Sequence, residues 1–281
     1  MIDQAAELRK LVLRAMRENQ AAEEPPPRLV LLTSGHSGVG VTTVGVNLAV
    51  ALSQQGLRVV LVDANAVTGS VARLCHLTSD LPVPDLLGRR RDIHEFLQLG
   101  PAGIQVVPGI RAGLTEPEIS SLAIERLVRQ LTHLGRHADS VLIDLGNGPN
   151  DLLRRLAQAA DDVIVVTSPE NLAITDAYAR IKLTLSGTSP AVLWLIVNLA
   201  RDAEQAADVH KRIRQSCERF LGHGIRLLGY VPVDHAVTTA EVAGLPLVAM
   251  QAETPASRAI HRIANDFVGR EGSGGRPKAA A

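Results

Sequence analysis

Lysine and aromatic residues are scarce in this chain of 281 residues. Of its 29 Lys and Arg residues, only four are lysines: Lys10, Lys182, Lys211 and Lys278. Aromatic side chains make up 2% of the residues and the formal net charge is zero. Because nucleic-acid binding relies on basic faces and stacking rings, we expect no nucleic-acid partner.

Cysteines and long apolar runs are also few. Cys75 and Cys217 lie far apart without a C-x-x-C pattern, which argues against a disulfide framework or a zinc site. No apolar run reaches the roughly 20 residues that a membrane-spanning helix needs. The first residues, MIDQAAELRK, carry Asp3 and Glu7, unlike a basic and apolar targeting leader. We therefore expect a cytoplasmic protein.

Most of the chain alternates between short apolar runs and amphipathic helical patterns. The alternation of buried strands with helices predicts an α/β fold with a mostly parallel sheet of seven to eight strands and helices on both faces. The body of this domain is expected at 29–268. The apolar runs lie at 28–34, 57–64, 104–109, 139–145, 161–168, 191–199 and 225–233.

Both ends of the chain differ from this body. Residues 1–20 predict a separate amphipathic helix, with Asp3 as its N-cap. Residues 21–28, AAEEPPPR, contain three consecutive prolines and predict a stiff, extended linker. The glycine-rich segment 269–281 predicts a disordered tail.

The loop after the first apolar run has the spacing of a phosphate-binding loop. Residues 35–42, GHSGVGVT, fit the pattern G-x-x-x-x-G-K-[ST] except that Val41 takes the place of lysine. Such a loop lies at the carboxyl edge of the sheet, where backbone N–H groups form a concave site for anions. Thr42 can offer a hydroxyl to Mg²⁺, but valine cannot neutralise phosphate charge.

The longer stretch LLTSGHSGVGVTTVGVNLA resembles the deviant loop of the MinD/ParA class of P-loop proteins, whose pattern is K-G-G-V-G-K-T-T. By this resemblance, His36 stands at the early signature lysine and Val41 at the second lysine. Five other pattern positions match: Gly38, Val39, Gly40, Thr42 and Thr43. Further similar segments extend the resemblance over nearly the whole body, and it implies a MinD-like P-loop fold.

The resemblance also implies a set of site residues. Asp63 and Asn65 stand at the family's D-x-D, and Asp144 and Gly148 stand at its switch motif, while Asn198 corresponds to a position near adenine. Because His36, Val41 and Asn65 replace the family's residues, no catalytic residue is assigned. The implied nucleotide-binding residues are Gly35, His36, Ser37, Gly38, Val39, Gly40, Val41, Thr42, Thr43, Gly148 and Asn198, and the implied Mg²⁺ ligands are Thr42 and Asp144.

The two missing lysines predict a degenerate site. A hydrogen bond to a charged group contributes about 1.5–3 kcal/mol, so their loss weakens ATP or ADP binding about a hundred-fold to ten-thousand-fold. A general drift from lysine to arginine would have left arginine, not His36 and Val41. Asn65 is neutral where the family has an acid. We interpret the chain as a pseudo-ATPase; the alternative is an ATPase that recruits a cation from Arg73 or from a neighbouring subunit.

The leader DQAAELR, residues 3–9, resembles the D-Q-A-x-x-L-R motif of FlhG-type proteins, also called YlxH or FleN. These MinD relatives regulate flagellar number and placement. The resemblance implies that the arm folds against an FlhF-like SRP GTPase and stimulates GTP hydrolysis. Asp3, Gln4, Leu8 and Arg9 would contact that partner. The alternative is an arm that packs on its own body.

The last helical pattern, ASRAIHRIANDFVGR, carries a short apolar stripe of Ile260, Ile263 and Phe267. Because the stripe is short, we expect it to pack against the body rather than dock on a membrane.

The resulting hypothesis is a flagellar regulator that acts by protein–protein contact, in the cytoplasm or at the cell pole through its partners, with a homodimer left open. The rival is an active MinD/ParA-type ATPase that organises flagellum, division site or chromosome. An iron–sulfur relative of this class would need cysteines on matching loops across a dimer, which Cys75 and Cys217 do not suggest.

Overall fold

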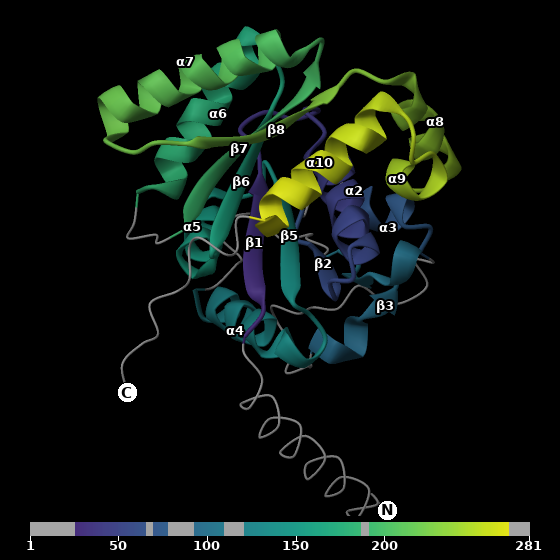
Figure 1. The fold of residues 1–281 in the computed structure, drawn as a ribbon. Coiled ribbons are helices and arrows are strands. Elements are labelled where there is room, and N and C mark those ends of the chain that lie inside the picture. Colours follow the sequence, from purple (N-terminus) through teal and green to yellow (C-terminus); the bar gives the residue numbers. More distant parts are fainter. Residues whose placement is uncertain (1–25, 66–69, 78–92, 110–120, 187–190, 270–281) are drawn as a thin grey trace, which may run out of the picture.

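The computed structural model describes residues 26–65, 70–77, 93–109, 121–186 and 191–269. These ranges form a central sheet between two helical layers (Figure 1). The predicted leader helix at 1–20, most of the predicted linker and residues 270–281 of the predicted tail lie outside the described residues. Gly269, which we assigned to the tail, is instead the last residue of a helix.

The sheet has eight strands in the order β3-β4-β2-β5-β1-β6-β7-β8. Every pairing is parallel except β3 with β4, so the predicted fold class is confirmed. The two-residue β3 was not predicted, because so short a strand has no recognisable alternation. The strands are β1 (Arg28–Thr33), β2 (Val59–Asp63), β3 (Gln98–Leu99), β4 (Gln105–Val107), β5 (Ser140–Gly146), β6 (Asp162–Thr167), β7 (Val192–Ala200) and β8 (Arg226–Pro232).

Helices cover both faces of the sheet, and each layer buries its own apolar cluster. One face carries α4 (Ser121–Thr132), α5 (Asn150–Ala159), α6 (Asn171–Thr184) and α7 (Ala203–Leu221). The other carries α2 (Val41–Gln54), α3 (Ser70–Leu74), α8 (His235–Ala243), α9 (Leu247–Met250) and α10 (Pro255–Gly269). Short 3₁₀ turns lie at Ile93–Phe96, Pro101–Gly103 and His133–Arg136. Because helices cover both sides, β2 and β5 are buried along their whole length and are mostly apolar.

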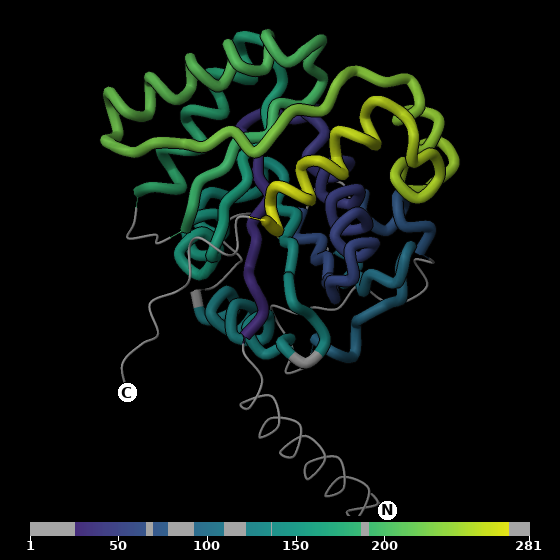
Figure 2. Tube along the Cα trace, in the orientation of Figure 1, coloured from purple at the N-terminus to yellow at the C-terminus, as the bar shows by residue number. Residues whose placement is uncertain are grey.

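The last helix packs on the body, as the sequence predicted. Figure 2 shows α10, drawn in yellow, on the same face of the sheet as α2. Ile260, Ile263 and Phe267 of α10 are 1–2% exposed. A side chain at Gly229 on β8 would come within 2.5 Å of Ile263, so this packing is close. Within the described ranges, no helix has the length and apolar content needed to cross a lipid bilayer.

Asp234 fixes the start of two helices at once. Its Oδ1 accepts a hydrogen bond from the N–H of Ala236 in the first turn of α8, at 2.9 Å. Its Oδ2 accepts from the N–H of Ala256 in the first turn of α10, at 3.0 Å. Unpaired N–H groups at a helix start need such acceptors. One carboxylate therefore joins α8 to the carboxyl-terminal helix.

Candidate nucleotide site

The loop between β1 and α2 has the conformation of a phosphate-binding loop. Gly38 and Gly40 have φ values of 79° and 84°, a left-handed region that side chains disfavour. A side chain at Gly40 would also meet the Asn198 amide nitrogen at 2.4 Å. That nitrogen donates a hydrogen bond to the Val39 carbonyl oxygen, at 2.9 Å. The loop shape is therefore set by glycine and by support from β7.

The lysine position of this loop has become part of the core. Val41 is 6% exposed and Val39 is 3% exposed, and both pack in the apolar cluster of the α2 face. Val41 also lines the cavity beside the loop. An apolar side chain there cannot offset charge on a bound phosphate.

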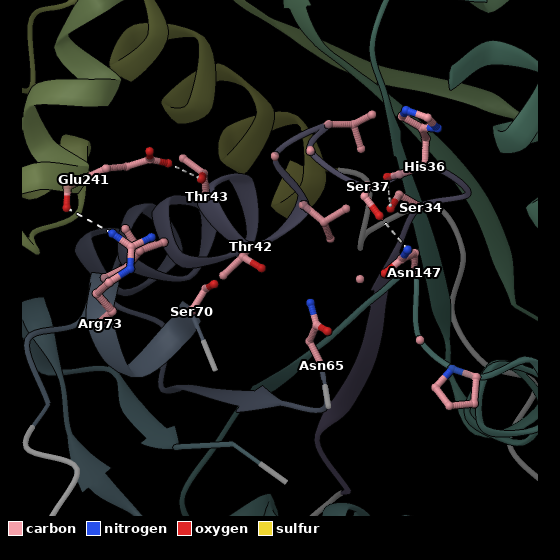
Figure 3. Close-up of a pocket in the computed structure, with 18 of the residues that line it drawn as sticks. Ser34, His36, Ser37, Thr42, Thr43, Asn65, Ser70, Arg73, Asn147 and Glu241 are labelled. Carbon is pink, nitrogen blue, oxygen red and sulfur yellow. Dashed lines mark hydrogen bonds between the residues drawn. The ribbon is translucent and has the colours of Figure 1, made fainter. Parts of the chain in front are cut away.

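A cavity of about 700 Å³ opens beside the loop. The side chains of Thr42 and Asn65 point into it, while His36 lies at its rim (Figure 3). The fold thus brings together most of the residues predicted for the site. The predicted residues that line the cavity are His36, Ser37, Gly38, Val39, Gly40, Val41, Thr42, Thr43, Asn65 and Gly148.

Four predicted residues lie just outside this lining. Asp63 and Asp144 are buried at the ends of β2 and β5. Gly35 packs against α6. Asn198 supports the loop through Val39 and is 7% exposed. The contact of Asn198 with an adenine ring stays a prediction.

Asp63 and Asp144 form a pair of buried carboxyl groups that we call the carboxylate floor. They are register partners on adjacent strands, exposed to 0% and 1%. Burial, with the nearby Asp144 charge, raises the pKa of Asp63 to about 7. Burial raises the pKa of Asp144 to about 6, although the Thr42 hydroxyl and the Gly146 N–H act in the opposite direction. The floor therefore binds protons more tightly than exposed aspartates do.

The carboxylate floor has the chemistry of a Mg²⁺ site. The Oδ1 atoms accept hydrogen bonds from the N–H groups of Asn65 and Gly146, at 3.0 and 3.1 Å. The Oδ2 atoms of Asp63 and Asp144 are buried and have no hydrogen-bond partner. Hard oxygen donors without a partner suit Mg²⁺. Together with the Thr42 hydroxyl, these oxygens fit the metal that the sequence predicted.

The segment from Gly146 to Asn150, which we call the switch segment, forms the wall opposite Thr42. The Gly146 carbonyl accepts hydrogen bonds from the Ser34 N–H, at 2.9 Å, and from the Thr33 hydroxyl, at 2.8 Å. The Gly148 N–H donates to the Leu145 carbonyl at 3.0 Å. Asn147 donates to the Ser37 hydroxyl at 2.8 Å (Figure 3). The switch segment is thus tied to the phosphate loop.

His36, at the signature-lysine position, is held by an acid. Its Nδ1 lies 2.8 Å from Asp176 Oδ2 on α6, and about one third of each side chain is exposed. His36 is therefore paired with Asp176 on α6 instead of reaching the centre of the cavity.

Arg73, the alternative cation, does line the cavity. Its Nη1 donates to the Glu241 carbonyl oxygen at 3.3 Å, and Glu241 Oε1 accepts from the Thr43 hydroxyl at 2.6 Å (Figure 3). The side chain of Arg73 thus reaches across from α3 to α8. Its role as a recruited cation stays a prediction.

Sequence reasoning missed several residues at this site, among them Asp176 and Arg180 on α6 and Glu241 on α8. Asp176 lies 140 residues from His36, Arg180 lies 147 residues from Thr33 and Glu241 lies 198 residues from Thr43, so spacing gave no signal for these contacts. One clue was available. Arg180 falls on the apolar stripe of α6 that includes Ala173, Ala177 and Ile181, where a charged side chain is unusual.

A glycine loop between the first strand and its helix, beside two buried aspartates at the carboxyl edge of a parallel sheet, defines a P-loop NTPase fold. The chain belongs to the ParA family: residues 27–268 match the family described as "NUBPL iron-transfer P-loop NTPase". The predicted MinD/ParA class is confirmed.

Solved structures show the same fold. The cell division ATPase MinD of Pyrococcus furiosus superposes with a TM-score of 0.71 and 22% identity, covering 86% of this chain and 98% of that chain. MinD of Pyrococcus horikoshii, complexed with Mg-ADP, gives a TM-score of 0.70 and 22% identity, covering 86% and 96%.

Sequence relatives support the FlhG branch. The antiactivator FleN of Pseudomonas aeruginosa is 29% identical over 215 residues, covering 76% of this chain and 77% of that protein. The flagellum site-determining protein YlxH of Helicobacter pylori is 26% identical over 187 residues, covering 66% and 63%. An iron-sulfur cluster carrier protein of Deinococcus radiodurans is 29% identical over 258 residues, covering 86% and 69%.

Proposed function

We propose that this protein is an FlhG-like regulator of flagellar number or placement that works by protein–protein contact. Its arm stimulates an FlhF-like SRP GTPase, and its body acts as a scaffold with a degenerate nucleotide site. It acts in the cytoplasm, or at the cell pole through its partners. The similarity to FleN and YlxH, combined with the motif at residues 3–9, supports this proposal.

The single observation that carries the degenerate-site part is the burial of Val41. The lysine position holds an apolar side chain packed in the core, at 6% exposure. His36 is engaged with Asp176, and Asn65 carries no charge. Nucleotide affinity is then limited to backbone N–H groups, Thr42 and the metal site. On this proposal, binding of ATP or ADP is weak and hydrolysis is slower still.

The role of the arm is tested by deleting residues 2–20 and measuring GTP turnover by an FlhF-like GTPase. We expect the truncated protein to lose stimulation, and a double variant with Gln4→Ala and Leu8→Ala to lose it as well. Glu18→Ala, outside the motif but in the same segment, serves as the control and should stimulate normally. Unchanged stimulation by the truncated protein would refute the role of the arm.

A second candidate function is that of a working nucleotide-binding ATPase, with ATP-dependent dimers. The carboxylate floor favours it, because two buried aspartate oxygens without partners suit Mg²⁺. Arg73 at the cavity wall could supply the missing cation. Calorimetry with ATP and Mg²⁺ separates the two candidates, since micromolar affinity favours the ATPase and millimolar affinity favours the scaffold.

The cysteines give no support to iron–sulfur transfer. Cys75 and Cys217 are buried in the apolar clusters of opposite sheet faces. Burial, with a nearby carboxylate in each case, raises the pKa of the Cys75 thiol to about 12 and that of Cys217 to about 11. Cluster ligands bind as thiolates and must lie close together, so two buried thiols of raised pKa on opposite sheet faces are not suited to share this role.

A further inference from the structure

Arg180 holds the switch segment from the α6 side. This arginine is 5% exposed. Its Nη1 donates to the Gly148 carbonyl oxygen at 2.9 Å, and its Nη2 lies 3.4 Å from the Gly146 carbonyl oxygen. Its Nε donates to the Thr33 hydroxyl at 2.8 Å, and Thr33 in turn donates to Gly146. One guanidinium therefore joins α6, the end of β1 and the switch segment.

The charge of Arg180 makes this contact specific. Burial lowers the pKa of Arg180 to about 10, so the group is still protonated at neutral pH. No carboxylate in the described part of the chain forms an ion pair with it. A buried cation is costly unless its N–H groups are hydrogen-bonded, and here peptide carbonyls supply most of the acceptors. The switch segment can move only by leaving these donors unpaired.

The same face of α6 also holds the phosphate loop. Asp176 lies four residues before Arg180, which places both on one side of the helix. Its carboxylate lies 2.8 Å from His36 Nδ1. Its carbonyl oxygen is so close to Gly35 that a side chain there would come within 2.0 Å. The phosphate loop thus rests directly on α6.

We propose that Asp176 and Arg180 form a clamp on α6 that holds both loops of the cavity in one conformation without a phosphate ligand. In this arrangement the Gly148 N–H donates a hydrogen bond to the Leu145 carbonyl oxygen, and the Gly148 carbonyl oxygen accepts one from Arg180. Presenting that N–H to a ligand would require release of the turn and of the clamp together.

This inference rests on the proposed function, in which nucleotide is not the switch. It adds a reason: the loops that a bound phosphate would otherwise order are already ordered by α6. The position of α6, rather than the occupancy of the cavity, then sets the conformation of the phosphate loop and the switch segment.

Hydrogen–deuterium exchange on the full-length protein tests the clamp. In the unaltered chain we expect slow exchange at residues 144–150 that Mg-ATP does not change. Arg180→Met, which keeps the apolar length of the side chain, should speed exchange in this segment by about tenfold or more. Arg180→Lys should restore part of the protection. Lys182→Met removes an exposed cation from the same helix and is the matched control.

Asp176→Asn provides a second variant that does not depend on a buried arginine. It should speed exchange at residues 34–40 and leave 144–150 slow. If Arg180→Met fails to fold, this variant decides the question. The clamp is overturned if the loops of the variants that fold exchange no faster than the same loops of the unaltered protein, or if Mg-ATP strongly slows the loops in the unaltered protein. Loss of GTPase stimulation on arm deletion is a separate readout, so the two proposals can fail independently.

Discussion

The phosphate loop and the carboxylate floor lie side by side, but they differ in how closely their side chains match the family pattern. The loop retains its backbone shape and lacks its cation, since Val41 is packed in the core. The floor retains Asp63 and Asp144, two buried acids with unpartnered oxygens. The loop shows that glycine placement and core packing are enough to preserve an anion-binding backbone, whatever the chemistry of the lysine position.

The two regions also differ in what they contribute to stability. Full burial of a valine side chain contributes about 1.5–3 kcal/mol relative to exposure. A buried carboxyl oxygen without a partner costs about 1–3 kcal/mol. The fold therefore gains from the altered loop but not from the floor. Folding alone explains Val41, whereas the retained acids need a ligand to explain them.

The largest expected effect comes from restoring the loop cations. A double variant with His36→Lys and Val41→Lys should bind Mg-ATP about a hundred-fold to ten-thousand-fold more tightly, because each lysine adds about 1.5–3 kcal/mol at phosphate. Calorimetry measures the change, and Val41→Leu serves as the apolar control. No gain in affinity would show that the cavity has lost more than charge.

Removing charge from the floor should stabilise the protein at high pH. Because the pKa of Asp63 is raised to about 7, its contribution to stability is present near pH 4 and is lost as the pH rises through 7. Asp63→Asn should therefore raise the free energy of unfolding at pH 8 by about 2–4 kcal/mol and change it little at pH 4. Urea unfolding at both pH values measures this.

Asp139→Asn is the matched control, for which we expect the opposite change in the free energy of unfolding at pH 8. A hydrogen bond from the Arg58 side chain lowers the pKa of Asp139. The ionised carboxylate of Asp139 stabilises the folded state at pH values above the ordinary pKa of aspartate, and this stabilisation is lost as the pH falls. This variant should therefore be slightly less stable at pH 8. A fall in stability of Asp63→Asn at pH 8 would mean that the buried charge is compensated in a way the contacts do not show.

Gly40→Ala measures how strictly the loop backbone is fixed. The residue has a φ of 84°, and a side chain would collide with the Asn198 amide. We expect a loss of about 2–3 kcal/mol in the free energy of unfolding, combining the left-handed conformation with the collision. Gly56→Ala has a φ of 90° but open space around it, so it should lose only about 1–2 kcal/mol. Equal losses would show that the Asn198 contact does not fix the loop.

The smallest effect is expected at the rim. Asn147→Ala removes an exposed hydrogen bond to Ser37, at 2.8 Å. The free energy of unfolding should change by less than about 0.5 kcal/mol, because water replaces the partner. A larger loss in urea unfolding would mean that rim contacts, rather than glycine and the core, hold the loop shape.

Local pattern predicted much of this molecule. The apolar alternation predicted seven of the strands, and the glycine loop after the first strand placed Thr42 at the carboxyl edge of the sheet. Asn65 and Asp144 were assigned to the site only through the family resemblance. Pattern did not reveal that His36 pairs with Asp176 or that Arg180 lies under the switch segment. These contacts depend on how α6, packed on β6, lies against the segments that follow β1 and β5, which single-sequence spacing does not specify. Asn198 shows the same limit, since its position in the motif did not predict that it supports Val39.

The double cap made by Asp234 links the end of the folded chain to the cavity wall. Since α8 carries Glu241, which accepts a hydrogen bond from Thr43 at the start of α2, two side chains connect the first turn of α10 to the mouth of the site. We therefore expect a displacement of α10 to be felt at the cavity, and a preparation without a tag beyond α10 is the better reference for every binding experiment above.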